Sequence, residues 1–295
     1  MKQNSEKKVA ARLSIASNCL IIIFKLAAGI VSGSISIISE AIHSMSDFLA
    51  SVLTYFAVMR SSEPADKDHP FGHGRYEDMA GFIEGVLIIL ASFYIIWEAC
   101  KKIIENSSSE FDSTLGIVVM AIAIVLNLVV SSYLLYVSKK TDSTALKADA
   151  KHLSTDVLSS LGVLIGLVLI KITEISLLDP LIAIFVALII LKSGFSITKE
   201  TLNNLVDGTL PDDDIKKIEE ILKNCKEIKG YKNFKSRKTG PNRDIDITLL
   251  CDGDMPLKSC HKICDSIETK IKSIFPNTLI TIHCEPFLEK QPTLC

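Results

Sequence analysis

The sequence lacks an excess of either charge, a CxxC pair and any low-complexity tract. Its 32 Lys and Arg residues nearly balance 34 Asp and Glu residues, so no strongly basic face is forced and nucleic acid is not an expected partner. The eight cysteines are scattered, and most of them follow residue 207 in a segment expected in the reducing cytosol. A disulfide framework is therefore not expected.

Hydrophobic residues are abundant but unevenly distributed. They make up 48% of the chain, and the mean hydropathy is +0.35. Only 37 of the first 207 residues are charged, against 29 of the 88 residues from 208 to 295. This contrast predicts a membrane domain over residues 1–207 and a soluble domain over residues 208–295, each large enough for its own core.

Six segments of the first domain approach the length of about 20 apolar residues that crosses a bilayer as a helix. Ser113–Ser138 has 26 residues and no charged side chain, whereas the other five contain a few charges. The sequence thus predicts an α-helical membrane protein with six transmembrane helices. The five interrupted segments are Val9–Val31, Ile35–Met59, Met79–Cys100, Leu146–Lys171 and Pro180–Ile197.

The basic residues predict the orientation in the membrane. With six spans, the N-terminal side and its loops hold 11 Lys and Arg residues, while the opposite loops hold three. Because positive charges favour the cytosolic side, both termini are expected in the cytosol. We therefore expect a multi-pass protein of the cell (inner or plasma) membrane.

The C-terminal segment predicts a small α+β domain. A helix is expected after Pro211, followed by strands at Tyr231–Arg237 and Asp244–Cys251. A second helix, Pro256–Phe275, and a last strand, Leu279–Cys284, complete the order αββαβ. This order is typical of a small ferredoxin-like sheet with helices on one face.

A short polar pattern occurs in two of the predicted spans. His43 and Asp47 lie in the second span, and His152 and Asp156 lie in the fifth. A spacing of four places each pair on one helical face, and two such pairs offer the four ligands of a tetrahedral Zn²⁺. The alternative is a pair of interhelical His–Asp hydrogen bonds. Ionisable residues are costly in a bilayer, so two pairs in one bundle favour the metal site.

The second predicted loop carries another candidate set. Asp66, His69 and His73 could hold a divalent ion at the cytosolic surface; the alternative is a Pro/Gly turn with solvated histidines. The spacing is not HExxH, and Pro and Gly between the histidines disfavour a helix. A metalloprotease is therefore not favoured.

At these residues the chain resembles the cation diffusion facilitator family of dimeric metal/proton antiporters, which are not enzymes. The resemblance covers nearly the whole chain. Its marks are the two HxxxD pairs, the loop from Pro64 to Arg75, and Leu205-Val-Asp207 with Leu210-Pro211 at the domain junction. The resemblance implies a homodimer in a lipid bilayer, a charge pair between Arg75 and Asp207, and three sites for metal ions. The transport site is His43, Asp47, His152 and Asp156, and the loop site is Asp66, His69 and His73.

The soluble domain departs from the zinc-transporting pattern of the family. Lys232 and Thr248 stand where that pattern has two further histidines. His261, His283 and Glu285 remain, which implies a regulatory site for a single ion. A thiol of Cys251, Cys264 or Cys284 is a further candidate ligand. The alternative is that the cysteines of the predicted helix Pro256–Phe275 are small side chains on a buried helix face and bind no metal.

The expected function is export of Zn²⁺ from the cytosol in exchange for H⁺. Imidazole nitrogens favour Zn²⁺, Co²⁺ or Fe²⁺ over harder ions. Export of Fe²⁺, Mn²⁺, Cd²⁺ or Co²⁺ is the alternative within the family. A membrane-anchored metal sensor and an intramembrane metalloenzyme are further alternatives. A membrane anchor, however, has no need of two HxxxD pairs. The remaining acids within the predicted spans that could act as a general base, Glu40 and Glu84, lie in no protease motif.

Overall fold

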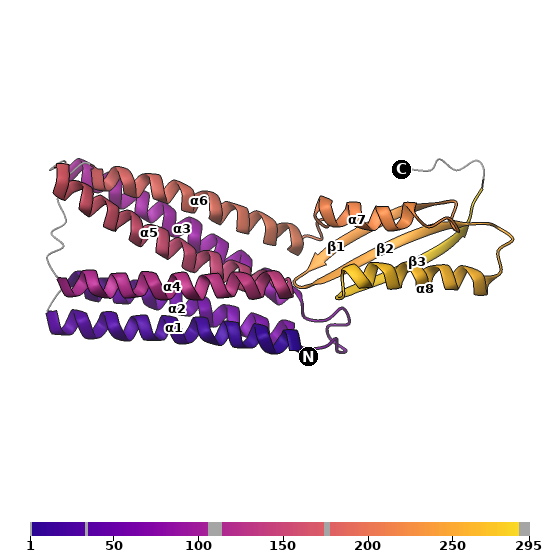
Figure 1. The fold of residues 1–295 in the computed structure, drawn as a ribbon, viewed down its shortest axis with the longest axis horizontal. Coiled ribbons are helices and arrows are strands. Elements are labelled where there is room, and N and C mark those ends of the chain that lie inside the picture. Colours follow the sequence, from indigo (N-terminus) through magenta and orange to yellow (C-terminus); the bar gives the residue numbers. More distant parts are fainter. Residues whose placement is uncertain (1, 33–34, 106–113, 174–177, 289–295) are drawn as a thin grey trace. The chain divides into compact units, whose positions relative to one another are not determined.

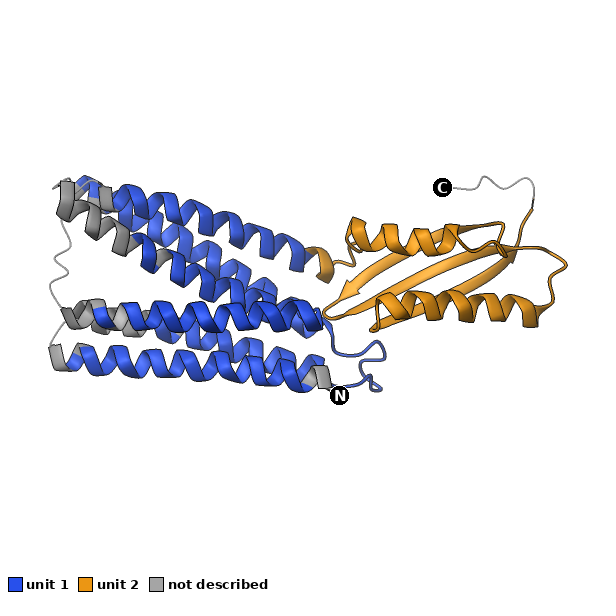
Figure 2. Ribbon diagram, viewed as in Figure 1, with its two compact units in different colours: residues 1–202 blue, residues 203–295 orange. Residues whose placement is uncertain are grey.

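The computed structural model describes residues 2–32, 35–105, 114–173 and 178–288. Figure 1 shows the fold of the chain. Two compact units are present, residues 1–202 and residues 203–295, drawn in different colours in Figure 2. This division falls five residues before the predicted domain boundary at 207.

The N-terminal unit is helical. Its elements are α1 (Lys2–Ser32), α2 (Ile35–Ser61), α3 (Arg75–Glu105), α4 (Thr114–Thr141), α5 (Thr144–Thr173) and α6 (Leu178–Leu205). Four of these helices contain a segment that is long and apolar enough to cross a membrane, namely Ser5–Ala28, Arg75–Lys101, Ala121–Thr141 and Pro180–Leu205. Within the described residues, α2 and α5 do not meet this criterion; both carry the acids and histidines of the HxxxD pattern. A count of six membrane crossings therefore stays a prediction.

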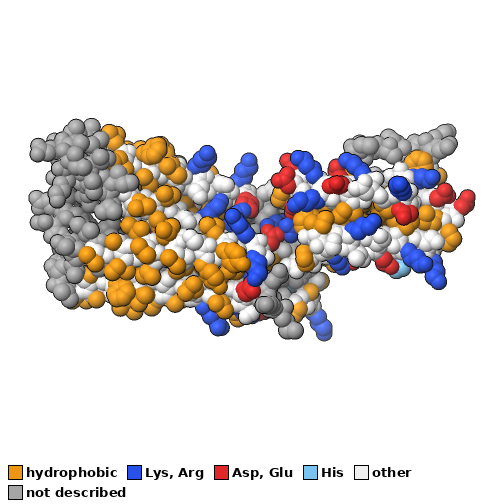
Figure 3. Space-filling model, in the orientation of Figure 1, with side chains coloured by type: hydrophobic (Ala, Val, Ile, Leu, Met, Phe, Trp, Pro, Cys, Tyr) orange, Lys and Arg blue, Asp and Glu red, His pale blue; other side chains and the backbone are white. Residues whose placement is uncertain are grey.

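Small residues allow these helices to pack closely. Ala10, Ala57, Ala80 and Ala145 lie in one buried cluster that joins α1, α2, α3 and α5. At Gly85 of α3, an added Cβ would come within 2.5 Å of the Thr198 hydroxyl of α6. Small contact residues are typical of helices that pack inside a membrane. Large apolar side chains instead cover the outer surface of the unit, as its visible face in Figure 3 shows.

The C-terminal unit has the predicted order αββαβ. Its elements are α7 (Asp212–Lys223), β1 (Gly230–Thr239), β2 (Asn242–Cys251), α8 (Leu257–Ile274) and β3 (Thr278–Pro286). The strand order is β1-β2-β3, with β1 antiparallel and β3 parallel to β2. Gly240, with φ of +58°, supplies the left-handed conformation in the turn between β1 and β2.

The two faces of this sheet differ in chemistry. On β2, Ile245, Ile247 and Leu249 point to one face, where they share a core with buried side chains of α7 and α8. The opposite face holds Thr248, which lies beside Lys232 of β1 and His283 of β3 in the strand register. Because strand side chains alternate, this register places the polar residues away from the helix-covered core.

Candidate metal centres

The two HxxxD helices meet at a partly buried cluster of ligand-type side chains. Asp47 of α2 and His152 and Asp156 of α5 each offer an atom within 4.8 Å of the others. The Nε2 atom of His152 lies 3.3 Å from a carboxylate oxygen of Asp47. The side chain of His43 lies outside the described residues, although its backbone belongs to α2, one turn before Asp47. Three of the four predicted transport ligands are thus close together.

His152 is buried, and no described residue gives it the hydrogen bonds that a structural histidine normally makes. Within the described part of the chain, neither of its ring nitrogens makes a hydrogen bond of normal geometry. Buried polar groups are usually hydrogen-bonded, and an unsatisfied one is costly. Two carboxylates beside an unsatisfied imidazole match the needs of a cation better than a pair of interhelical hydrogen bonds.

Two buried acids near this cluster were not predicted as site residues. Asp149 lies one turn before His152 and accepts a hydrogen bond from Ser51 at 3.2 Å. Glu84 of α3 accepts a hydrogen bond from Thr54. Both acids were visible in the sequence as charges inside apolar helices, and their burial shows that they face the bundle interior. They extend the polar region around the predicted ligands from α2 and α5 to α3.

Hydrogen bonds from α1 hold this region in place. Asn18 donates to the backbone carbonyl of Asp47 at 3.4 Å and to the Ser51 hydroxyl at 2.7 Å. Ser14 also lies 2.9 Å from the Ser51 hydroxyl. These contacts tie α1 to the same part of α2 that carries Asp47, and so they position the ligand helix.

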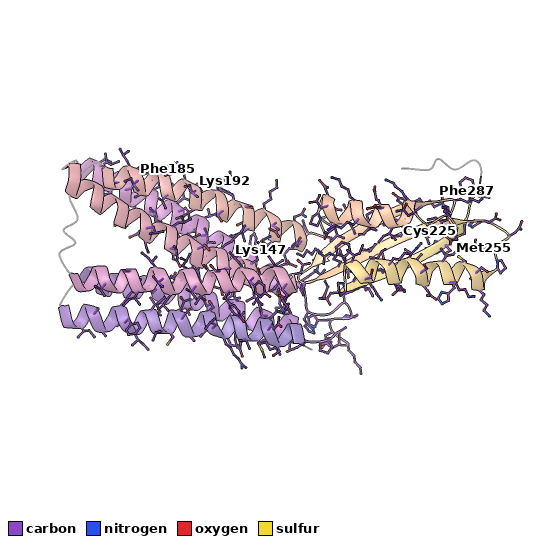
Figure 4. All side chains as sticks on the ribbon, viewed as in Figure 1. Lys147, Phe185, Lys192, Cys225, Met255 and Phe287 are labelled. Carbon is purple, nitrogen blue, oxygen red and sulfur yellow. The ribbon has the colours of Figure 1, made fainter. Side chains whose placement is uncertain are left out.

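A second layer of charge pairs secures the helices elsewhere. Lys7 of α1 makes a buried ion pair of 2.5 Å with Glu77 of α3, and Glu77 also accepts a hydrogen bond from Ser61. Lys147 of α5, labelled in Figure 4, pairs with Glu200 of α6 at 2.6 Å. The Lys7–Glu77 pair is buried, so its loss would leave an uncompensated charge inside the bundle. The Lys147–Glu200 pair is partly exposed and therefore contributes little to stability.

The loop between α2 and α3 assembles all three of its predicted ligands. Asp66, His69 and His73 form a group whose ligand atoms lie within 4.8 Å of one another. One oxygen of Asp66 is 3.5 Å from Nδ1 of His69, and the other is 3.4 Å from Nε2 of His73. His73 is buried, and among the described residues its ring nitrogens have no hydrogen-bond partner. His69 and Asp66 are exposed, as a turn with solvated histidines would have them, whereas the burial of His73 differs from that alternative.

Backbone amides set the charge of the loop carboxylate. The amides of His69 and Asp68 donate to the same Asp66 oxygen at 2.7 and 3.0 Å. The His69 amide is the main cause that lowers the pKa of Asp66 below its ordinary value, and positive charge on the two histidines adds to it. Asp66 therefore remains an anion at neutral and mildly acidic pH.

The predicted residues of the C-terminal site are less well assembled. His283 lies 3.6 Å from Glu285, but His261 is largely exposed and lies 3.8 Å from Asp265. No group of three potential ligands among the described residues contains His261 or His283. Lys232 instead pairs with Glu285 at 2.7 Å, which is the main cause that lowers the pKa of this carboxyl. Within one chain, the predicted metal ligand Glu285 is therefore already paired with the ammonium group of Lys232.

The predicted charge pair involves residues of different units. Arg75 begins α3 in the N-terminal unit. Asp207 lies in the C-terminal unit, where its carboxylate is 3.3 Å from the guanidinium of Arg237. The pairing of Arg75 with Asp207 stays a prediction.

Comparison with known proteins places the chain in a family. Residues 11–206 match the cation efflux transmembrane domain, and residues 210–287 match the cytoplasmic domain of cation efflux proteins, a dimerisation domain. The chain is a cation diffusion facilitator. The predictions of this family, of a membrane-spanning metal transporter and of a protein that is not an enzyme are thereby confirmed, and the metalloenzyme alternative falls.

Relatives match this cation diffusion facilitator over almost its whole length. Protein p34 of Rickettsia rickettsii is 34% identical over 280 residues, which cover 95% of this chain and 92% of that protein. The cation-efflux pump FieF of Shewanella oneidensis is 30% identical over 286 residues, which cover 97% of this chain and 96% of that pump. FieF of Pectobacterium carotovorum is 31% identical over 94% of this chain and 92% of that pump.

Proposed function

We propose that this cation diffusion facilitator exports Zn²⁺ from the cytosol across the cell membrane in exchange for protons. The observation that carries the proposal is the convergence of Asp47, His152 and Asp156 from two helices into one partly buried group. His43 would complete a tetrahedral set of two nitrogens and two carboxylate oxygens, which suits Zn²⁺. The ion is the cargo of this site.

Proton exchange follows from the chemistry of the ligands. A neutral imidazole binds the ion through a nitrogen lone pair, and protonation removes that lone pair and adds a repelling charge. A site that opens to the more acidic side therefore loses its metal as it gains protons. The carboxylates of Asp47 and Asp156 compensate the charge of whichever cation is present.

The proposed arrangement has six membrane crossings, with both termini and residues 208–295 in the cytosol. α2 and α5 then cross the membrane with their polar residues facing the bundle interior, where such residues are tolerated. The soluble domain, with its ferredoxin-like order, joins two copies in a homodimer, and the loop site lies at the cytosolic surface. The proposal includes an ion pair between Arg75 and Asp207 that stabilises the dimer. The Arg75→Asp variant should loosen the dimer, and the double variant Arg75→Asp/Asp207→Arg should partly restore it. Crosslinking in membranes measures the dimer in both variants.

The test is zinc uptake into proteoliposomes under an imposed pH gradient. The Asp47→Ala variant should lose transport, because it removes a ligand and a compensating charge together. Asp213→Ala, which changes an exposed acid on α7, serves as the matched control and should transport normally. Transport by Asp47→Ala at the parental rate would contradict the proposed site.

The same vesicles separate the alternatives. Competition with Fe²⁺, Mn²⁺, Cd²⁺ and Co²⁺ ranks the ions, and a different preferred ion would replace Zn²⁺ as the cargo. An absence of flux for every ion would favour a membrane-anchored sensor. Zinc uptake without any dependence on the pH gradient would refute proton exchange.

A further inference from the structure

Four cysteine side chains meet at one end of the core of the C-terminal unit. Cys251 ends β2, Cys284 lies on the neighbouring strand β3, and Cys260 and Cys264 lie one turn apart on α8. All four belong to the helix-covered side of the sheet. The cluster is close to Phe287, labelled in Figure 4, whose amide donates to the carbonyl of Cys251 at 2.7 Å.

The sulfur atoms are spaced as metal ligands are. Cys251 and Cys260 are 3.8 Å apart at sulfur, and Cys264 and Cys284 are 3.3 Å apart. The sulfurs of Cys251, Cys260 and Cys284 all lie within 4.8 Å of one another. Four thiolates around Zn²⁺ at about 2.3 Å in a tetrahedron have sulfurs about 3.8 Å apart. Three of the thiols thus already lie at ligand spacing, and Cys264, which is outside that group but touches Cys284, would move toward the other two sulfurs to become the fourth ligand.

The surroundings separate this cluster from the histidines of the same domain. His283 precedes Cys284 on β3 and so points to the opposite face of the sheet, toward Lys232 and Thr248 in the register. A mixed site of His283 with the core thiols is not formed. Cys251 and Cys260 are buried, whereas Cys264 and Cys284 are half-buried, which leaves the ion a short path to the site.

We propose that Cys251, Cys260, Cys264 and Cys284 form a tetrathiolate site for one thiophilic divalent cation, Zn²⁺ or Cd²⁺, that stays bound in the C-terminal unit. Binding displaces the thiol protons to solvent and joins β2, β3 and α8 through four metal–sulfur bonds. The ion thereby stabilises the domain core, and its site is separate from the proposed transport site, which contains no sulfur among its predicted ligands.

The alternative is a core that uses thiols only as small apolar groups. Free cysteines often serve in this way. Burial raises the pKa of Cys251 to about 11 and also raises the pKa of Cys264 and Cys284, so these thiols are neutral without a metal. Neutral thiols are compatible with both states, and the distinction therefore needs a spectroscopic test.

The test uses the full-length protein in detergent, stripped of metal under reducing conditions and titrated with Co²⁺. A tetrahedral thiolate site should show a sulfur-to-cobalt charge-transfer band that saturates at one ion per chain. Zn²⁺ and Cd²⁺ should remove the band, and Mg²⁺ should not. Because the predicted transport and loop ligands contain no thiol, this band reports only on cysteine ligands.

Variants assign the ligands. Cys251→Ser should abolish the band, and Cys264→Ser, at a half-buried position, should weaken or abolish it in a protein that still folds by circular dichroism. Cys225→Ser removes a buried thiol of the same domain outside the cluster, labelled in Figure 4, and should leave the band unchanged. Asp47→Ala should also leave it unchanged, which separates this proposal from the transport site.

Three results would overturn the proposal. The wild-type protein with its thiols reduced could show no charge-transfer band. The band could persist in both Cys251→Ser and Cys264→Ser. Finally, the band could be lost in Cys225→Ser.

Discussion

Imidazoles and thiols take opposite positions in the two units. In the helices of the N-terminal unit His152 is buried beside carboxylates, while Cys19 and Cys100 are exposed. In the C-terminal unit His261 and His283 are exposed, while the thiols lie in the core. Nitrogen and oxygen ligands suit an ion that must be released, whereas four thiolates suit an ion that stays. The proposed transport site and the proposed tetrathiolate site would thus separate metal movement from metal retention by ligand type.

The largest effect is expected at the half-buried acids of the proposed transport site. Asp156→Asn keeps the side-chain size but removes the charge that faces His152, so we expect zinc transport to fall by about a hundredfold or more. Stopped-flow uptake into proteoliposomes measures this rate. Asp213→Asn is the control, and similar rates in both variants would remove Asp156 from the site.

The next effect concerns the acids that surround the ligands. Asp149→Asn and Glu84→Gln change buried neighbours of His152 without removing a predicted ligand, so each should slow transport by roughly tenfold to a hundredfold. The same assay compares them directly with Asp156→Asn. An effect as large as that of Asp156→Asn would make either acid a direct ligand.

A third prediction converts the exposed face of the sheet into a binding site. Lys232→His removes the ammonium group that pairs with Glu285 and places an imidazole in register with His283. We expect the full-length protein to bind about one more Zn²⁺ per chain, measured by calorimetry. Lys235→His on the same strand is the control, and unchanged stoichiometry in Lys232→His would show that the exposed histidines do not bind metal within one chain.

The smallest effect is expected in the loop site. The folded-state pKa of Asp66 is lowered, so its hydrogen bonds stabilise the loop above the ordinary carboxyl pKa of about 4 and are lost as pH falls through the lowered value. The His69 amide should therefore stay protected from hydrogen exchange at neutral and mildly acidic pH and lose this protection only as Asp66 is protonated. Asp66→Asn should abolish this acid transition, and a loss of protection in the wild type well above the ordinary carboxyl pKa would show that a group other than Asp66 controls the loop.

Local periodicity explains most of what could be predicted. Two HxxxD spacings predicted that His152 and Asp156 share a face, and the structure places them with Asp47. Alternating residues predicted β2, although the strand begins at Asn242 rather than Asp244. Element ends were less accurate because hydrogen bonds with neighbouring strands, such as the pairing of Thr239 with Asn242, extend a strand beyond its apolar residues.

The sequence by itself determined the helices and strands, the spacing of the ligand pairs and the division into an apolar and a polar region. These features depend on residues a few positions apart, whose relative directions follow from helix and strand geometry. Tertiary packing was needed to show that Lys232 pairs with Glu285, that Glu84 and Asp149 are buried, and that the sulfurs of Cys251, Cys260 and Cys284 converge, with Cys264 against Cys284. Such contacts join distant segments, and they depend on strand register and on how α8 packs against the sheet.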